Sequence, residues 1–360
     1  MKFELKTRQI CLFLIAIIPI NKLFIMPSIL AKSAGEDMWI SCLISLAIDF
    51  LTILSVVLVR KRTNETFFTL LKNCFGNFGA KIIFFLFFIY FMVKAIIPIN
   101  EQKEYVELTL YTLKPSIFYF LPFFIAAFYF CTKSLRVIGR AADVVWAFTV
   151  IGFITLLSLS LSNADFTALL PVGAHGLNNI LSGTSKSFNW FGDAAYLLFF
   201  VGEFEYRKKD GLKIIFSYLL GAVMVMIFII VFYSIFTSIA HRQRFALTEI
   251  AKYTTVINNI GRFDYIGIIL LMFSNFFSIS APLFFACKVL NKIFDFKKNW
   301  ISPLVVISIQ AAVIIFLPRY YASIENLMQT HAAIYFFILG NLLPALTPLL
   351  TIRRKTYASA

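Results

Sequence analysis

The chain has 360 residues, of which 60% are hydrophobic and 14% charged, and its mean hydropathy is +0.84. A soluble domain of this length cannot bury so much apolar surface, so the composition excludes a soluble globular protein and indicates an integral membrane protein. A net charge of +15 would suit a nucleic acid partner, but the basic residues stand in short clusters without a continuous basic face; we therefore expect membrane lipid around the chain and no nucleic acid.

The N-terminal sequence allows two interpretations. "MKFELKTRQI" followed by an apolar run resembles a signal peptide, and "ILAKSA" has the small residues of a cleavage region. The apolar run is, however, too long and too interrupted by polar residues for a signal peptide, and further apolar segments follow it. We therefore predict a first transmembrane helix.

Ten apolar segments approach the length of about 20 residues that a helix needs to cross the hydrocarbon core. In chain order they are residues 10–31, 38–59, 80–100, 116–132, 141–161, 181–203, 212–239, 264–287, 300–317 and 331–352. The stretch 64–76 is too short to cross and is predicted to lie along the cytoplasmic interface. No separate soluble domain is visible, so the chain, residues 1–360, is predicted to be one all-α membrane domain.

The lysines and arginines predict how these segments are oriented. Most of the 33 basic residues lie in the two terminal tails and in every second connection, for example in the clusters 60–62 and 207–209. Cytoplasmic connections are the ones that carry an excess of basic residues. We therefore expect a multi-pass protein with both termini in the cytoplasm, which agrees with an even number of crossings.

Two outer connections, residues 162–180 and 240–263, are longer than the others. The first has the Gly, Pro and Asn content of a structured loop, and the second has helical spacing of Leu247, Ile250, Ala251 and Val256. Both could form short surface helices or lids, or could simply connect the neighbouring segments.

Cysteine and histidine residues predict no metal site. The five cysteines show no CxxC spacing and mostly lie in apolar segments, as small buried side chains do. The three histidines are scattered through loops and segment ends. Nucleophile elbows, Walker sequences and HExxH motifs are also absent from the sequence, so we expect neither an enzyme nor a cofactor.

Four ionisable residues fall near the middle of predicted segments, namely Lys22, Asp49, Lys94 and Asp193. An unpaired charge facing lipid is costly, so each should face the bundle interior or a water-filled cavity. Such residues are candidates for a functional site, although they could instead form structural ion pairs between helices. Because opposite charges lie at similar depth, we predict that Asp49 contacts Lys22 or Lys94.

Helix-breaking residues accompany these charges in the first and sixth segments. They are Pro19, Asn21, Lys22 and Pro27 in the first segment and Asn189, Gly192 and Asp193 in the sixth. Broken helices at corresponding places in two halves point to a midplane binding site in transporters built from inverted repeats. Because five is odd, a second half at about 181–352 would enter the membrane in the opposite sense to a first half at about 10–161. We therefore predict a 5+5 inverted repeat with broken helices 1 and 6.

Three stretches carry a resemblance to a known family. They are "IMPSILAKSAGEDMWIS" (25–41), "SFNWFGDAAYLLFFVGEF" (187–204) and "LTEIAKYTTVINNIGRFDYIGIILLMFSNFFSISAPLFFACKVLNKIF" (247–294). In these stretches, and in their order along nearly the whole chain, the sequence resembles the B subunit of the spore-germination nutrient receptors. These subunits form the spore germination permease family, which is part of the amino acid–polyamine–organocation superfamily. One departure is "PINKLF" in the first segment, where the family commonly has a glycine-rich break.

The resemblance implies a ten-helix fold of the leucine-transporter type and a role in sensing small nutrients such as amino acids. It also implies other germination receptor subunits as partners, and a location in the spore inner membrane or plasma membrane of a spore-forming bacterium. At the place of the departure, the Lys22 ammonium could take the place of a coupling cation or capture a ligand carboxylate.

The predicted ligand-binding site combines the two broken segments with their neighbours. Its residues are Asn21, Lys22, Tyr90, Lys94, Asn189, Trp190, Phe191, Gly192, Asp193 and Asn275, with Asp49 as a buried ion-pair candidate. Half-helix N-termini and Lys22 suit a ligand carboxylate, while Asp193 suits an α-ammonium or holds Lys22 when no ligand is bound.

Other polar and aromatic residues have an ordinary alternative. Asn275, Ser278 and Ser280 could face the site or hold helices together, and Tyr90, Trp190, Phe191 and Tyr196 could wall an apolar pocket or simply pack. Glu101, Glu104 and Glu107 follow the third segment at helical spacing, and we expect a solvated outer face there.

Three functions remain open on sequence grounds. The first is a receptor subunit that senses a small nutrient, which the resemblance favours. The second is an amino-acid permease coupled to protons or ions through the same residues. The third is a structural subunit with a vestigial site.

Overall fold

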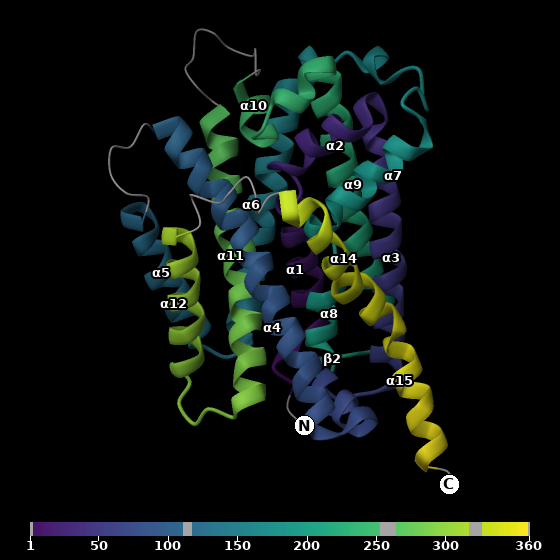
Figure 1. Ribbon diagram of the computed structural model, residues 1–360, viewed down its shortest axis with the longest axis vertical. Helices are drawn as coiled ribbons and strands as arrows, with labels where there is room; N and C mark the ends of the chain where they lie inside the picture. The colour runs from purple at the N-terminus through teal and green to yellow at the C-terminus, as the bar shows by residue number, and fades with distance from the viewer. Residues whose placement is uncertain (1–2, 111–116, 253–263, 317–325, 359–360) are drawn as a thin grey trace.

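The computed structural model of the protein is a bundle of helices and describes residues 3–110, 117–252, 264–316 and 326–358 (Figure 1). Its helices are α1 (Thr7–Ile20), α2 (Met26–Ala34), α3 (Met38–Arg62), α4 (Phe67–Leu110), α5 (Ile117–Cys131), α6 (Arg136–Ser160), α7 (Gly176–Ser187), α8 (Ala194–Phe200), α9 (Asp210–Phe236), α10 (Ala246–Lys252), α11 (Asp264–Phe294), α12 (Ile301–Phe316), α14 (His331–Phe337) and α15 (Leu343–Ala358). Each of the ten predicted segments contains helix.

Among the described residues, six helical stretches are long enough and apolar enough to cross a membrane. They are Met26–Arg62, Phe67–Glu104, Arg136–Asn163, Asp210–Arg242, Ile269–Phe294 and His331–Thr351. Shorter apolar helices are Thr7–Ile20, Phe120–Cys131 and Ile301–Phe316. The chain is therefore an all-helical, multi-pass membrane protein, as its composition predicts.

The first predicted segment is broken where the sequence indicates. Helix α1 ends at Ile20, one residue after Pro19, and α2 begins at Met26. Pro27 lies in the first turn of α2, where a missing N–H is tolerated. The Phe24 carbonyl between the two helices accepts a hydrogen bond of 2.9 Å from the N–H of Ala246, at the start of α10. The outer connection 240–263 thus contains a helix that covers the break, and its residue Val256 lies outside the described residues.

The sixth predicted segment is broken as well. Helix α7 passes into a short 3₁₀ turn, Phe188–Trp190, and α8 begins at Ala194. Between them Gly192 has φ 87°, a left-handed conformation that favours glycine. The chain therefore crosses the middle of the bundle here without regular helical hydrogen bonds.

Two further helices are irregular. Gly76, with φ 72° and ψ 177°, separates the first part of α4 from its long apolar part, so the predicted stretch 64–76 has its own helical direction. Between α14 and α15 a π-helix runs over Ile338–Leu342. Such insertions often occur at functional sites.

The chain ends lie at the same end of the bundle (Figure 1). There β1 (Leu5–Lys6) pairs in parallel with β2 (Phe204–Glu205), just before α1 and just after α8. The buried Thr7 hydroxyl donates to Asp210 Oδ2 at 2.7 Å, and an Arg60 N–H donates to the Phe204 carbonyl. These contacts hold the start of α1, in the first broken segment, next to the end of α8, in the second.

At the opposite end, short helices cover the bundle. The connection 162–180 forms the 3₁₀ helices Leu161–Asn163 and Phe166–Leu169 before α7, and the buried Asp37 carboxylate accepts the N–H groups of Gly173 at 2.7 Å and His175 at 3.1 Å. This connection is therefore packed onto the corner between α2 and α3.

The predicted solvated face of glutamates after the third segment is wrong for Glu101, which is 4% exposed and accepts a hydrogen bond of 3.0 Å from Trp190 Nε1. Glu104 pairs with Arg244 at 2.9 Å. Helix α4 continues past residue 100 and packs inside the protein, so these carboxylates meet protein donors. The Glu107 side chain lies outside the described residues.

Candidate ligand-binding site

Lys22 and Asp193 form a buried ion pair between the two broken segments. Lys22 Nζ lies 2.5 Å from Asp193 Oδ2, and both side chains are 0% exposed. The ammonium also donates to the Ile18 carbonyl at 3.2 Å, near the end of α1, and lies 4.9 Å from the centre of the Phe191 ring. The arrangement satisfies a carbonyl freed by the helix end and joins the two breaks.

Helix α4 supplies donors to the second break. Lys94 Nζ donates to the carbonyls of Asn189 at 3.0 Å and Phe191 at 2.6 Å, and Tyr90 Oη donates to the carbonyl of Gly192 at 3.2 Å. Tyr90 and Lys94 are four residues apart and so share one face of the helix. Irregular backbone at membrane depth requires such partners, and α4 provides them.

Above this group the protein is almost closed. Asn21, Lys94, Glu101, Asn189 and Trp190 belong to the lining of a cavity of about 10 Å³, which has room for roughly one water molecule. The Asn189 side-chain oxygen is buried and has no hydrogen-bond partner. A ligand as large as an amino acid would therefore need the broken segments to move apart.

Asp49 is not paired with a lysine as predicted. Its carboxyl group is 0% exposed, and neither oxygen has a hydrogen-bond partner. Within the described residues Lys22 pairs with Asp193, while the Lys94 ammonium binds backbone carbonyls. Asp49 thus lies in the same charged cluster without a direct cationic partner, because the two lysines are already engaged by the broken backbone and by Asp193.

Asn275 on α11 is buried but is engaged within its own helix. The Ser278 hydroxyl lies 2.9 Å from Asn275 Oδ1 and donates to the Asn275 carbonyl at 2.8 Å. The neighbouring Ser280 hydroxyl is buried and has no partner. The side-chain contact described for Asn275 stays within α11, and Asn275 is not among the hydrogen-bond partners described for the Lys22–Asp193 pair.

Sequence reasoning missed the last segment as part of this site. A Cβ atom added to Gly192 would lie 2.8 Å from the Gly340 Cα atom, and one added to Gly340 would lie 2.9 Å from the Gly192 Cα atom. The π-helix and the second break therefore touch backbone to backbone. The sequence signal was Gly340-Asn341 inside an apolar run that also contains Pro344 and Pro348.

Aromatic rings fill the space on the other side of the ion pair. Tyr196 and Phe199 follow Asp193 on α8, and their rings lie 5.5 Å and 6.1 Å from the ring of Phe285 on α11. Phe91 of α4 lies 5.4 Å from Phe285 and 5.1 Å from Phe199. These four rings, Phe91, Tyr196, Phe199 and Phe285, form an aromatic plug.

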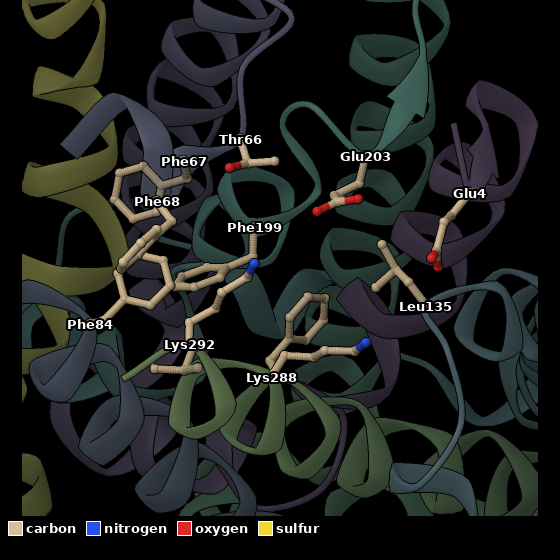
Figure 2. A pocket seen from close by; sticks show the side chains of 12 residues that line it. Glu4, Thr66, Phe67, Phe68, Phe84, Leu135, Phe199, Glu203, Lys288 and Lys292 are labelled. Atoms are coloured by element: carbon tan, nitrogen blue, oxygen red, sulfur yellow. The ribbon is translucent and has the colours of Figure 1, made fainter. Parts of the chain in front are cut away.

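Beyond the aromatic plug lies a pocket of about 260 Å³ at the end of the bundle that carries the chain ends. Phe199 and Phe285 belong to both the plug and the pocket lining. Figure 2 shows the carboxylates of Glu4 and Glu203 on one side of this pocket and Lys288 and Lys292 of α11 on another. Asp193 and Phe199 are six residues apart, a rise of about 9 Å at 1.5 Å per residue, so the pocket lies within about two helical turns of the ion pair.

Comparisons with known proteins agree with these features. A family model described as spore germination protein matches residues 3–324. The chain is 22% identical over 330 residues to spore germination protein XB of Bacillus anthracis, covering 90% of this chain and 92% of that protein. It is 24% identical over 186 residues to spore germination protein YndE of Bacillus subtilis (strain 168), covering 51% of this chain and 50% of that protein. The chain belongs to the spore germination protein family.

Proposed function

We propose that this protein is the nutrient-sensing membrane subunit of a spore germination receptor and binds a small, amino-acid-like ligand between its two broken segments. The observation that carries the proposal is the fully buried Lys22–Asp193 pair. Its two charges match the two ends of a zwitterion, because an ammonium can bind a carboxylate and a carboxylate an α-ammonium. A ligand that engages them separately must open the pair.

Opening the pair supplies a route from occupancy to conformation. Lys22 is attached to α1 and α2, and Asp193 to α8, so a ligand between them changes the distance between the two breaks. A ligand shifts an equilibrium only through different affinities for its two states. In the present state the Lys22–Asp193 pair is fully buried and the neighbouring cavity of about 10 Å³ is too small for an amino acid, so this state excludes the ligand. Partner subunits of the receptor would read the movement.

The proposal includes an architecture. Ten membrane-crossing helices in two inverted five-helix repeats, about 10–161 and 181–352, would place the two breaks at related positions at mid-depth. The common location of the chain ends supports an even number of crossings (Figure 1). We place both termini in the cytoplasm because of the basic clusters beside them, and the protein in the spore inner membrane or the plasma membrane.

Ligand-dependent stabilisation of the purified protein tests the site. A ligand at 100 times its dissociation constant stabilises the folded protein by about 2.7 kcal/mol, so the responding amino acid should raise the melting temperature of the wild type. Lys22→Met should remove this increase, whereas the exposed-lysine control Lys213→Met should keep it. An equal ligand-induced increase in Lys22→Met would place the binding site elsewhere.

A proton- or ion-coupled amino-acid permease is a second candidate, favoured by the pocket of about 260 Å³ behind the aromatic plug. Such a pocket would be the inner end of a pathway past Phe199 and Phe285. Uptake of labelled amino acids into liposomes separates the two functions: a permease accumulates the label, and a receptor subunit binds it without uptake.

A further inference from the structure

Three buried carboxyl oxygens of the charged cluster have no hydrogen-bond donor. They are Asp49 Oδ1, Asp49 Oδ2 and Asp193 Oδ1. Both residues are 0% exposed, so water does not replace the missing donors. A buried ionised carboxylate without donors is costly, and neutralisation by a proton is the usual solution.

Helix α3, which carries Asp49, packs against α8, whose N-cap residue is Asp193, and the two carboxyl groups are close enough for a side-chain hydrogen bond. Two ionised carboxylates cannot form that bond, because both only accept. With one proton between them, the group that carries it donates to the other. Like charges this close also disfavour double ionisation, as in paired carboxylates generally.

The other charged or titratable groups that interact with Asp49 do not replace a proton between the two carboxyl groups. They are Lys22 beside the first break, Lys94 on α4, Asp193 at the second break and Tyr218 on α9. Lys22 Nζ is committed to Asp193 Oδ2 and the Ile18 carbonyl. Lys94 Nζ is committed to two carbonyls of the second break. The Tyr218 hydroxyl also faces Asp49, but it donates its single proton to the Leu46 carbonyl at 2.9 Å.

We propose that Asp49 and Asp193 form a proton-binding site and share one proton in the closed protein. Asp49 then donates to Asp193 Oδ1, while Asp193 Oδ2 keeps its ion pair with Lys22. Two ammonium groups and two carboxyl groups that hold one proton give the cluster a net charge of about +1 by formal charge counting. Asp49 is a proton carrier in this arrangement, and the lysines retain their present partners.

Binding of the proposed ligand would displace the proton that Asp49 and Asp193 share. This step rests on the proposed function: an α-ammonium that approaches Asp193 stabilises the doubly ionised pair, so the shared proton leaves as the ligand enters. The excess positive charge of the closed cluster attracts the ligand carboxylate. Binding of a zwitterion would then release one proton per site, whereas an anion without an ammonium would release none.

Infrared spectroscopy of the purified protein without any nutrient tests the proton site separately from ligand binding. A protonated carboxyl group has a C=O stretch that an ionised carboxylate lacks. At pH 7 we expect the band of the Asp49→Asn variant to be weaker than that of the wild type by the intensity of one protonated carboxyl group. The control Asp143→Asn, at a partly exposed carboxylate paired with Arg8, should lose none. Equal band intensity in wild type and Asp49→Asn would overturn the proposal.

The stability of Asp49→Asn gives a second test. Asparagine is neutral, has nearly the shape of aspartic acid, and can donate to Asp193 Oδ1 as the shared proton does. We therefore expect Asp49→Asn to melt within a few degrees of the wild type. Failure to fold, or a large drop in melting temperature, would mean that the closed protein needs the negative charge of Asp49, and would also overturn the proposal. Neither result depends on whether a nutrient binds.

Discussion

Replacing Lys22 by Met should destabilise the protein strongly. Methionine keeps most of the length of the lysine side chain but removes its charge, so Asp193 Oδ2 loses the partner that now lies 2.5 Å away. Breaking a buried ion pair by removing one partner costs about 3–5 kcal/mol. Both side chains are 0% exposed, so solvent does not screen the loss.

The expected drop in melting temperature is about 6–10 °C, taking roughly 2 °C per kcal/mol, the lower limit for large domains. A thiol-reactive fluorogenic dye measures it in detergent, because Cys11, Cys42, Cys131 and Cys287 are buried and react on unfolding.

Lys213→Met is the matched control for this experiment. Lys213 pairs with Asp210 at 2.8 Å, but its side chain is 63% exposed. Asp210 is buried but keeps the Thr7 hydroxyl and the Arg207 N–H as donors. Loss of the solvent-exposed Lys213 ammonium should therefore cost about 0–1 kcal/mol, and this variant should melt within about 2 °C of the wild type. In the double variant Lys22→Met/Asp193→Asn both charges are gone, and part of the lost stability should return. If Lys22→Met melts as the control does, the ion pair does not hold the breaks together.

Four further changes test other parts of the structure. Gly192→Ala should lower the stability of the protein by about 2–4 kcal/mol, because a Cβ atom there would meet Tyr90 Oη at 2.6 Å and the backbone of Gly340. The control Gly173→Ala has a similar φ of 85° and no atom within 4 Å of the added Cβ, so in the same melting assay it should cost only the backbone strain of about 1–2 kcal/mol. Asp37→Ala should leave two N–H groups of the outer connection without their acceptor and speed its cleavage in limited proteolysis, whereas unchanged cleavage would mean that other contacts hold it. The hydroxyl and the N–H of Thr167 hold the pKa of Asp165 below its ordinary value. A carboxyl group whose pKa is lower in the folded than in the unfolded protein stabilises the fold above its unfolded pKa, and this stabilisation is lost as the pH falls through the folded pKa. Thr167→Val should therefore weaken the loss of stability around pH 3–4, and an identical pH profile of stability would contradict this. A fluorescent protein fused after residue 358 should fluoresce in the cytoplasm, and an extracellular location would refute the proposed orientation.

Local backbone chemistry made the breaks visible in the sequence. Pro19 lies in the last turn of α1 and Pro27 in the first turn of α2, while Gly192 takes the positive φ at the second break. Such residues act through their own dihedral angles and missing donors, which do not depend on distant parts of the chain. The same holds for the membrane class, because composition alone decides which solvent the chain can tolerate.

Pairings between helices were not visible in this way. The sequence contains two lysines and two aspartates at similar depth, and any pairing of opposite charges among them is arithmetically possible. The rotation of α3 and α4 in the bundle leaves Asp49 beside another carboxyl group and directs Lys94 to backbone carbonyls. That rotation depends on the packing of every neighbouring helix.

The sequence by itself determined the class of the protein, the places of its helices and the two breaks, since each follows from hydropathy or from the backbone preferences of a few adjacent residues. Only the tertiary structure decided that Glu101 is buried against Trp190 and that Gly340 touches Gly192, and only it decided between Asp193 and Asp49, both allowed by the sequence, as the partner of Lys22. These contacts join residues from about 90 to 170 positions apart, as the separations of 89 and 171 for the two hydrogen-bonded pairs show. Their geometry results from how whole helices pack, and no local sequence pattern contains that information.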